Sequence, residues 1–381
     1  MNCTALALAL VLGTGAEPEL EQRMRASLVR YADYAHAVYA ESERHARSLE
    51  EAIEAFLARP SAAGLERARE AWRQGRVVYG RSEVLRFYDG PIDDAEVGVE
   101  TLLNAWPLDE NYIDAVEGGT YPGIVGDVER FPHLDASLLT LLNERGGEAN
   151  ISIGWHAIEF LLWGQDHDPH GPGQRSHRDY LVGESAFAAR RAQYLSLCAG
   201  LLVEHLERVR TAWAPEQDNY RARFLADEAR SSFRKVLAGM IVLSGFEMSG
   251  ERLAVAYETG DQEEEHSCFS DHTHVDFRSN QEGVLGLWMR EFDGRPGADV
   301  RSVALEAAPD LAPVIEDALE RSLRSIVGMP VPFDAAIRGR APEDPERKRV
   351  LAALLALEQQ AELLAALGLA LGFEVAIQPG G

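Results

Sequence analysis

The sequence predicts an all-helical protein, and three observations lead to that fold class. Apolar residues recur at alternating spacings of three and four over long stretches, which is the period of one helix face. The alternation of apolar and polar residues that is typical of strands is nearly absent. Apolar residues make up 46% of the 381 residues and charged residues 26%, a composition that supports a packed core. Long helices joined by short turns favour helical bundles, in which each helix buries one stripe.

The elements follow from this periodicity in chain order. The expected helices cover residues 20–59, 65–89, about 176–213, 219–253 and 349–372. Pro60, Pro215 and Gly90 act as breakers, and Asp218 or Asn219 is the expected cap of the fourth helix. Irregular stretches are expected at residues 89–135, 164–176, 263–278 and 293–299, and such loops on a helical scaffold often carry function. A break near 212–218 divides the chain into expected domains 17–213 and 214–381.

The N-terminal residues 1–16 are expected to be a signal peptide. Residues 3–16 read CTALALALVLGTGA, an apolar run that ends in small residues and precedes an acidic stretch. The run is too short to span a bilayer, which takes about 20 apolar residues. Export is therefore expected, with an apolar tail as the alternative. Cys198 and Cys268 would then meet an oxidising compartment, and their spacing leaves open whether they pair.

The charge balance restricts the class of partner. Lys and Arg number 37 and Asp and Glu number 62, so the net charge is 37 − 62 = −25. A surface this acidic repels phosphate backbones, which argues against a nucleic-acid partner and suits a protein that meets cations. The sequence also lacks H-E-x-x-H, G-x-S-x-G and P-loop signatures.

The segment ISIGWHAIEFLLWG, residues 151–164, is the most informative for chemistry. It is apolar on nearly every side, as a buried helix is, yet it contains His156 and Glu159. Three residues apart, these side chains lie on one helix face. They could ligate a metal or act as a general base with its orienting partner. The alternative is a core histidine that is satisfied by the neighbouring carboxylate.

Two further regions hold candidate groups. Residues 263–276 contain Asp271 and His274 among other acidic residues and histidines, which suits metal ligation or, alternatively, a solvated acidic loop. Residues 81–94 and 104–114 contain Glu83, Arg86 and Trp106. A Glu and an Arg three apart are commonly a surface helix pair, and the aromatic residue is commonly packing.

Taken together, these segments resemble the imelysin family, whose members are also described as iron-regulated protein A-like or insulin-cleaving membrane-protease-like proteins. The family's G-x-H-x-x-E motif stands here as Gly154, His156 and Glu159. In the order of the chain, the other matching patterns are R-F-x-x-G-P-I-D at 86–93, W-P-L-D-x-x-Y-I-D at 106–114 and E-H-S-C-F-S-D-x-T-H-x-D at 265–276. Four motifs in order are a specific resemblance, and it spans most of the chain after residue 20.

The resemblance implies two bundle-like domains related by approximate two-fold symmetry, with the motifs converging at their interface. It also implies an exported bacterial protein of the periplasm or cell envelope that is linked to iron uptake, with peripheral association with outer-membrane or periplasmic iron-uptake proteins. A peptidase label is attached to the family as well.

These considerations give one leading hypothesis and two alternatives. The leading hypothesis is a binding protein that takes iron, another divalent metal or a small ligand at an interdomain site. The alternatives are a metallopeptidase that uses His156 and Glu159, and an interaction scaffold in which that pair is structural. His156 and Glu159 are the candidate metal ligands. The full set of candidate ligand-binding residues is Gly154, His156, Glu159, Glu83, Arg86, Asp93, Trp106, Asp109, Asp271 and His274.

Overall fold

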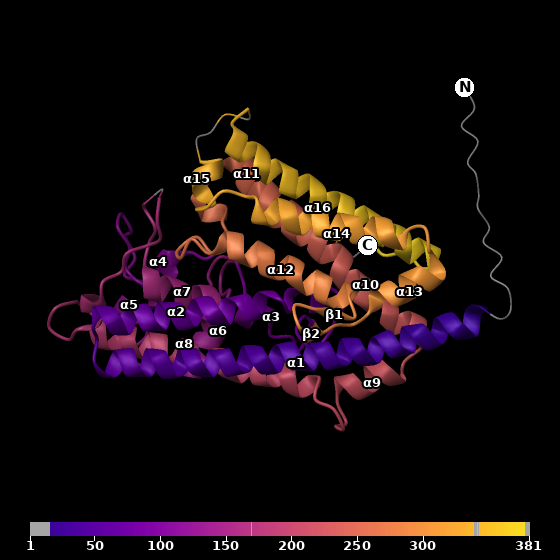
Figure 1. Cartoon of the computed structure of the whole chain (residues 1–381). Coiled ribbons are helices and arrows are strands. Elements are labelled where there is room, and N and C mark those ends of the chain that lie inside the picture. Colours follow the sequence, from indigo (N-terminus) through magenta and orange to yellow (C-terminus); the bar gives the residue numbers. More distant parts are fainter. Residues whose placement is uncertain (1–15, 169, 339–340, 342, 378–381) are drawn as a thin grey trace.

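Helices dominate the computed structural model, which describes residues 16–168, 170–338, 341 and 343–377 (Figure 1). The α-helices are α1 (Ala16–Ala58), α2 (Ala62–Gly80), α3 (Glu100–Leu103), α4 (Glu110–Ile113), α5 (Gly123–Gly126), α6 (Ala136–Leu142), α7 (Trp155–Trp163), α8 (Ala188–Ala212), α9 (Tyr220–Ala226), α10 (Ala229–Val242), α11 (Val255–Thr259), α12 (Thr273–Trp288), α13 (Val300–Ala307), α14 (Ala312–Val327), α15 (Asp334–Ile337) and α16 (Pro345–Ala370). The 3-10 turns are η1 (Glu83–Leu85), η2 (His177–Tyr180) and η4 (Gln262–Glu264), and η3 (Leu243–Ala254) is a π-helix.

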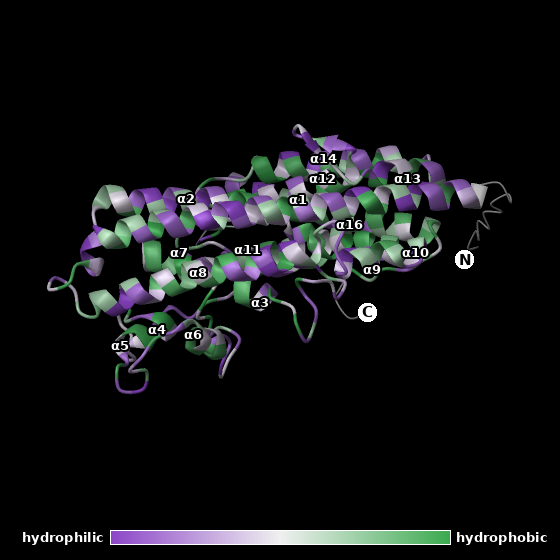
Figure 2. Cartoon of the chain, turned by 90° about the horizontal axis from the view of Figure 1, so that it is seen from below, coloured by the Kyte–Doolittle hydropathy of each residue, from purple (hydrophilic) through white to green (hydrophobic). Residues whose placement is uncertain are grey.

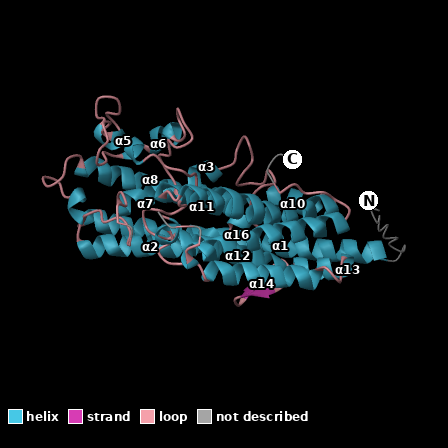
Figure 3. Cartoon of the chain, turned by 90° about the horizontal axis from the view of Figure 1, so that it is seen from above, coloured by secondary structure: helices cyan, strands magenta, loops and turns pink. Residues whose placement is uncertain are grey.

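Strand is confined, within the described ranges, to a short hairpin and one isolated bridge. Strands β1 (Glu291–Phe292) and β2 (Arg295–Pro296) pair antiparallel, and the hairpin lies at the edge of the helical body (Figure 3). The predicted all-helical fold class is therefore confirmed.

Helix α1 extends along the whole body (Figure 1). It packs against α2 and α8 and also against α10 and α13. Its 43 residues run without a break until Pro60, and Ser61 then caps α2 by accepting a hydrogen bond from the N–H of Gly64 at 3.1 Å. One group of helices around it consists of α2, α7 and α8. A second group consists of α10, η3, α12, α14 and α16. Helix α1 contacts α2 and α8 in the first group and α10 in the second, and α12 also packs on α2.

The apolar side chains of both groups form one continuous core cluster. In Figure 2, hydrophilic and hydrophobic residues are interspersed along α1 and α2, as expected of helices that bury only one face. Helix α16 is long and apolar enough to cross a membrane by length and composition, but 50% of its most apolar window is buried inside the protein. It packs against α14, η3 and α10, as a core helix does. The approximate two-fold relation between two domains stays a prediction.

Three expected helices differ from the structure. The second ends at Gly80 rather than before Gly90, because the N–H and hydroxyl of Ser82 both bond to the carbonyl of Tyr79 and close a turn. The third begins at Ala188, preceded only by the short η2. The fourth is capped by Asn219 as expected, but it breaks at Asp227 and continues as α10 and then as η3.

Candidate functional site

The motif helix α7 begins at a glycine that no other residue can replace without strain. Gly154 has φ of +93°, and a Cβ atom there would lie 2.6 Å from the carbonyl oxygen of Leu103. Every residue of α7 is buried. The helix therefore carries His156 and Glu159 into the interior of the protein, and its start lies directly beside Leu103, the last residue of α3.

His156 and Glu159 form a buried, hydrogen-bonded pair. Nδ1 of His156 lies 2.9 Å from Oε2 of Glu159. The other carboxyl oxygen accepts hydrogen bonds from the N–H of Ser270 at 3.0 Å and from its hydroxyl at 2.6 Å. Burial raises the pKa of Glu159 to about 8, and burial together with the charge of Arg76 holds the pKa of His156 well below its ordinary value. Both groups are therefore mainly neutral at pH 7.

Behind this pair lies a buried arginine that joins α2 to α12. Arg76 donates to both carboxylate oxygens of Asp276 at 3.2 Å and to Oδ1 of Asn104. Nδ1 of His266 lies 3.1 Å from Oδ2 of Asp276 and from Nη2 of Arg76. Burial would raise the pKa of Asp276, but Arg76 and His266 hold it well below its usual range. Burial, followed by the charge of Arg252, lowers the pKa of His266 to about 4.

The ring of His156 lies between two other rings. Its centroid is 5.0 Å from that of Trp106 and 4.8 Å from that of His266. Nε2 of His156 is buried and has no hydrogen-bond partner among the described residues. Residues of three sequence motifs thus meet at this histidine.

A second ion-pair network lies beside the first. Oε2 of Glu83 accepts from Arg86 at 2.8 Å and from Arg252 at 2.7 Å. Arg252 also donates to Glu247 on η3, and Arg86 pairs with Glu100 at 3.1 Å. Burial would raise the pKa of Glu83, but Arg86 and Arg252 lower it to about 2. Burial raises the pKa of Glu100 to about 7.

These two networks border one open pocket of about 360 Å³, which we call the motif pocket. This volume lies within the range of small-molecule sites. Its walls come from the segments around α3, the π-helix η3 and the loop before α12. The lining residues are Arg86, Glu100, Thr101, Asn104, Ala105, Trp106, Pro107, Glu144, Phe246, Glu247, Glu251, Arg252, Val255, Glu264 and His266.

The π-helix shapes one wall of this pocket. Residues four and five apart align on one face when a helix has the wider π period. Glu247, Glu251 and Arg252 have this spacing, and all three line the pocket. The Glu247–Arg252 ion pair, with Oε1 and Nη2 2.7 Å apart, also joins residues five apart.

The predicted site residues fall into two sets. Glu83, Arg86, Trp106, Gly154, His156 and Glu159 lie in or directly behind the motif pocket. No hydrogen bond or ion pair within the described residues joins Asp93, Asp109 or Asp271 to His156. Asp93 accepts from backbone N–H groups of its own loop, at Phe87, Tyr88 and Gly90, and Asp109 caps α4.

Asp271 and His274 lie apart from the pocket lining. Burial raises the pKa of Asp271 to about 7, with the charges of Asp166 and Asp334 next in importance. The ring of His274 faces that of His272 at a centroid distance of 6.4 Å. The 263–276 segment does reach the motif helix, but through Ser270, His266 and Phe269.

Sequence reasoning missed Arg76, Asn104 and Arg252 as site residues. The sequence does indicate that Arg76 is buried, because Trp72, Arg76 and Tyr79 follow the four-and-three spacing of the buried face of α2. A charged residue at a core position is costly without a partner, and this cost points to a network. Arg252 had no comparable signal, because its position depends on the π period of η3.

A bare metal ion does not fit the described side chains. No group of three or more His, Cys, Asp or Glu residues in the described part of the chain is arranged to hold one. His156 and Glu159 are bonded to each other, and the cation of Arg76 lies nearby. Cys198 and Cys268 are both buried and free, so they do not pair with each other.

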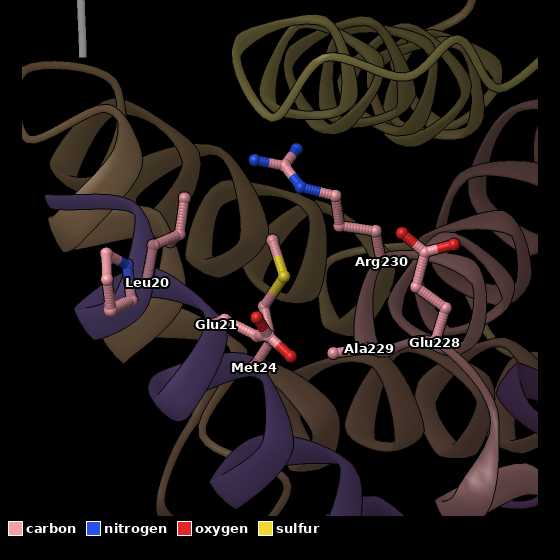
Figure 4. A pocket seen from close by; sticks show the side chains of 7 residues that line it. Leu20, Glu21, Met24, Glu228, Ala229 and Arg230 are labelled. Atoms are coloured by element: carbon pink, nitrogen blue, oxygen red, sulfur yellow. The ribbon is translucent and has the colours of Figure 1, made fainter. Parts of the chain in front are cut away.

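A second pocket, of about 410 Å³, lies at the start of α1 (Figure 4). Leu20 and Met24 of α1 face Ala229 and Arg230 at the start of α10 across it. No motif residue lines this pocket. We therefore assign the candidate site to the motif pocket.

The fold and the buried His–Glu pair define an all-helical protein with a motif-lined pocket, and the chain belongs to the imelysin family. The Imelysin family model matches residues 35–364. The iron-regulated protein A of Synechococcus elongatus is 23% identical over 328 residues, which cover 83% of this chain and 79% of that protein.

The fold is also found in a solved structure. The crystal structure of a protein described as an iron-regulated protein A precursor from Parabacteroides distasonis matches with a TM-score of 0.71 and 17% identity. The match covers 92% of this chain and 95% of that one. At this identity the match shows a shared fold.

Proposed function

We propose that this protein is an exported, iron-associated binding protein that takes a small ligand in the motif pocket. One observation carries the proposal: Arg86, Trp106 and His266 come from three separate sequence motifs and line the same pocket. His156, from a fourth motif, packs against two of them. A purely structural role of these residues would not require an open pocket where the four motifs meet, so the pocket favours ligand binding.

The iron association rests on the relatives, which are described as iron-regulated proteins. Export rests on the apolar N-terminal run, most of which lies outside the described residues. An exported protein of this kind would act in the periplasm or cell envelope. Peripheral association with iron-uptake proteins there is part of the same proposal.

In this proposal His156 organises the pocket rather than chelating a bare ion. Its neighbour Glu159, with a pKa of about 8, fixes the imidazole ring through Nδ1. The ring in turn supports Trp106 and His266, two of the rings that line the pocket. A small iron complex would then contact the lining residues and not the buried pair itself.

The test is a binding measurement with two variants of one lining residue. Metal analysis of the purified protein and calorimetric titration with ferric complexes report on bound iron. Trp106→Leu is expected to weaken binding of the ferric complex about tenfold or more, whereas Trp106→Phe, which keeps an aromatic ring, retains most of it. Binding of no ferric complex, or equal binding by both variants, would contradict the proposal. Hydrolysis of a peptide library that depends on His156 would favour the peptidase alternative instead.

A further inference from the structure

The charges around the motif pocket do not balance. Two arginines and five glutamates line it: Arg86, Arg252, Glu100, Glu144, Glu247, Glu251 and Glu264. Both guanidinium groups are already engaged, Arg252 by Glu83 and Glu247, and Arg86 by Glu83 and Glu100. The lining therefore contains more negative charge than its own cations can neutralise.

The surplus belongs to three carboxylates at the mouth of the pocket. Glu251 is exposed, and Glu144 and Glu264 are half-buried. Neither an ion pair nor a side-chain hydrogen bond connects any of these three carboxylates with another residue in the described ranges. We call Glu144, Glu251 and Glu264 the acidic rim. A rim of one sign concentrates ions of the opposite sign, and the net charge of −25 acts in the same direction.

A residue that lines the pocket also carries a buried donor without a partner. Asn104 lines the pocket and is only 4% exposed. Its Oδ1 accepts from Arg76, which fixes the orientation of the amide, and its Nδ2 has no hydrogen-bond partner among the described residues. A buried N–H group that is left unsatisfied is destabilising, so this donor is suited to an acceptor on a ligand.

Two aromatic side chains also line the motif pocket. Trp106 and Phe246 both line the pocket and are half-buried. Organic cations are attracted to such rings at distances up to about 6 Å. The rim carboxylates, in contrast, are not arranged to chelate a bare metal ion together, since the described residues contain no such group of three.

From these observations we propose that the motif pocket selects an organic cation that also carries a neutral oxygen acceptor. The ammonium group would lie between the aromatic rings and the acidic rim, and a carbonyl or hydroxamate oxygen would accept from Nδ2 of Asn104. This inference rests on the proposed function and names the ligand class of the same pocket. Two sources share this chemistry, a free amine and a ferric chelate with a free ammonium group.

The experiment uses matched probes on the purified protein. The first is the ferric complex of a linear trihydroxamate that ends in one free amine. The second is the same complex with the amine acetylated, which removes the positive charge. Ferric citrate serves as an anionic complex, and the iron-free trihydroxamate amine separates the two sources of the cation. Binding is followed by calorimetry and by Trp fluorescence at low and high salt.

The cationic ferric complex is expected to bind roughly tenfold more tightly than its acetylated analogue at low salt, with ferric citrate weakest. The triple variant Glu144→Gln, Glu251→Gln, Glu264→Gln is expected to abolish this preference, so that the cationic and acetylated complexes bind with equal affinity. A matched control, Glu129→Gln, Glu358→Gln, Glu362→Gln, removes the same charge from exposed positions outside the pocket. It is expected to keep the preference.

Each outcome decides one of the two proposals. Equal affinity for the cationic and acetylated complexes, or an unchanged preference in the triple variant, overturns the cation inference but leaves the proposed function standing. Binding of the iron-free amine alone, sensitive to the triple variant, supports the cation inference and contradicts the iron association. Binding of none of the probes overturns both.

Discussion

At the scale of single residues, burial determines the chemistry of the motif pair. Glu159 is fully buried, and its carboxyl group accepts two hydrogen bonds from Ser270 while facing an imidazole. Taking a carboxylate out of water without a positive partner favours its protonated form. The H-x-x-E pair of this protein is therefore a neutral acid beside a neutral imidazole, and this state suits orientation of a ring better than chelation of a metal.

The pH dependence of stability follows from Glu159. Its pKa rises from 4.5 in the unfolded chain to about 8 in the folded protein. The folded state binds its proton more tightly, so this contribution to stability is complete below pH 4.5 and is lost as the pH rises through 8. Relative to wild type, Glu159→Gln should gain about 4 kcal/mol in free energy of unfolding between pH 5 and pH 9, because the amide mimics the protonated acid.

Urea unfolding at several pH values measures this difference. Glu159→Ala is the contrasting variant, since it leaves Ser270 and His156 unpaired and should destabilise the protein by about 2 to 4 kcal/mol at pH 5. Because it also removes the titrating carboxyl group, this deficit relative to wild type should shrink toward pH 9. Parallel pH profiles for wild type and Glu159→Gln would show that Glu159 keeps an ordinary pKa.

The sequence predicted some of these contacts and could not predict others. The spacing of His156 and Glu159 places them on one helix face, and they form the hydrogen bond that the alternative of a satisfied core histidine predicts. Ser270 completes the site from 111 residues away, and no local pattern reveals such a partner. Asp93 was a candidate because it is acidic and belongs to a motif. Its loop instead turns backbone N–H groups toward it, so that its carboxylate holds the turn.

At the scale of elements, one glycine fixes the entry into α7, and a buried ion pair, Arg76–Asp276, joins α2 to α12. Periodicity located most long helices, because each has a single buried stripe. It could not show that the helix after Asn219 would break and then widen into a π-helix. The spacing of apolar residues differs little between an α-helix and a π-helix. The change from α10 to the π-helix η3 is therefore seen only in the structure, where η3 packs on α16.

Gly154→Ala should be one of the most damaging single-methyl additions in this protein. It combines an unfavourable positive φ with a contact of 2.6 Å to backbone. Gly118 is the matched control, because its φ is +77° and a Cβ there meets no atom within 4 Å. We expect Gly118→Ala to cost about 1 kcal/mol and Gly154→Ala to cost at least about 2 kcal/mol more, measured by urea unfolding. Equal losses would mean that the backbone at the end of α3 moves aside at little cost.

The Arg76–Asp276 pair should hold α2 and α12 together more strongly than a surface pair holds its helix. Arg76→Met leaves the Asp276 carboxylate buried without its cation, with an expected loss of about 3 to 5 kcal/mol in free energy of unfolding. Arg324→Met, which breaks an exposed pair with Glu320, is the control and should cost less than about 1 kcal/mol. Adding Asp276→Leu to Arg76→Met should recover part of the loss, and a further decrease would contradict the buried-charge explanation.

At the scale of the whole molecule, the excess of negative charge opposes compactness. The 62 acidic residues outnumber the 37 basic ones, and most surface pairs only partly compensate them. Self-repulsion of this kind is screened by salt. The melting temperature should therefore rise by several degrees between roughly 10 mM and roughly 300 mM NaCl, measured by circular dichroism. KCl should act in the same way, and a fall in melting temperature would show that specific ion pairs outweigh the overall repulsion.

Helix α1 has a mechanical consequence for how any ligand enters and leaves. An uninterrupted helix of 43 residues is a rod of roughly 65 Å, and it packs against α2 and α8 in one group of helices and against α10 in the other. Clamshell closure, in which two lobes swing together over a captured molecule, would require that rod to bend. The aperture of the pocket is therefore set once, when the chain folds. If the pocket takes a ligand as proposed, exchange would depend on the side chains at the aperture and on diffusion, so that occupancy should follow the concentration outside without a slow closing step.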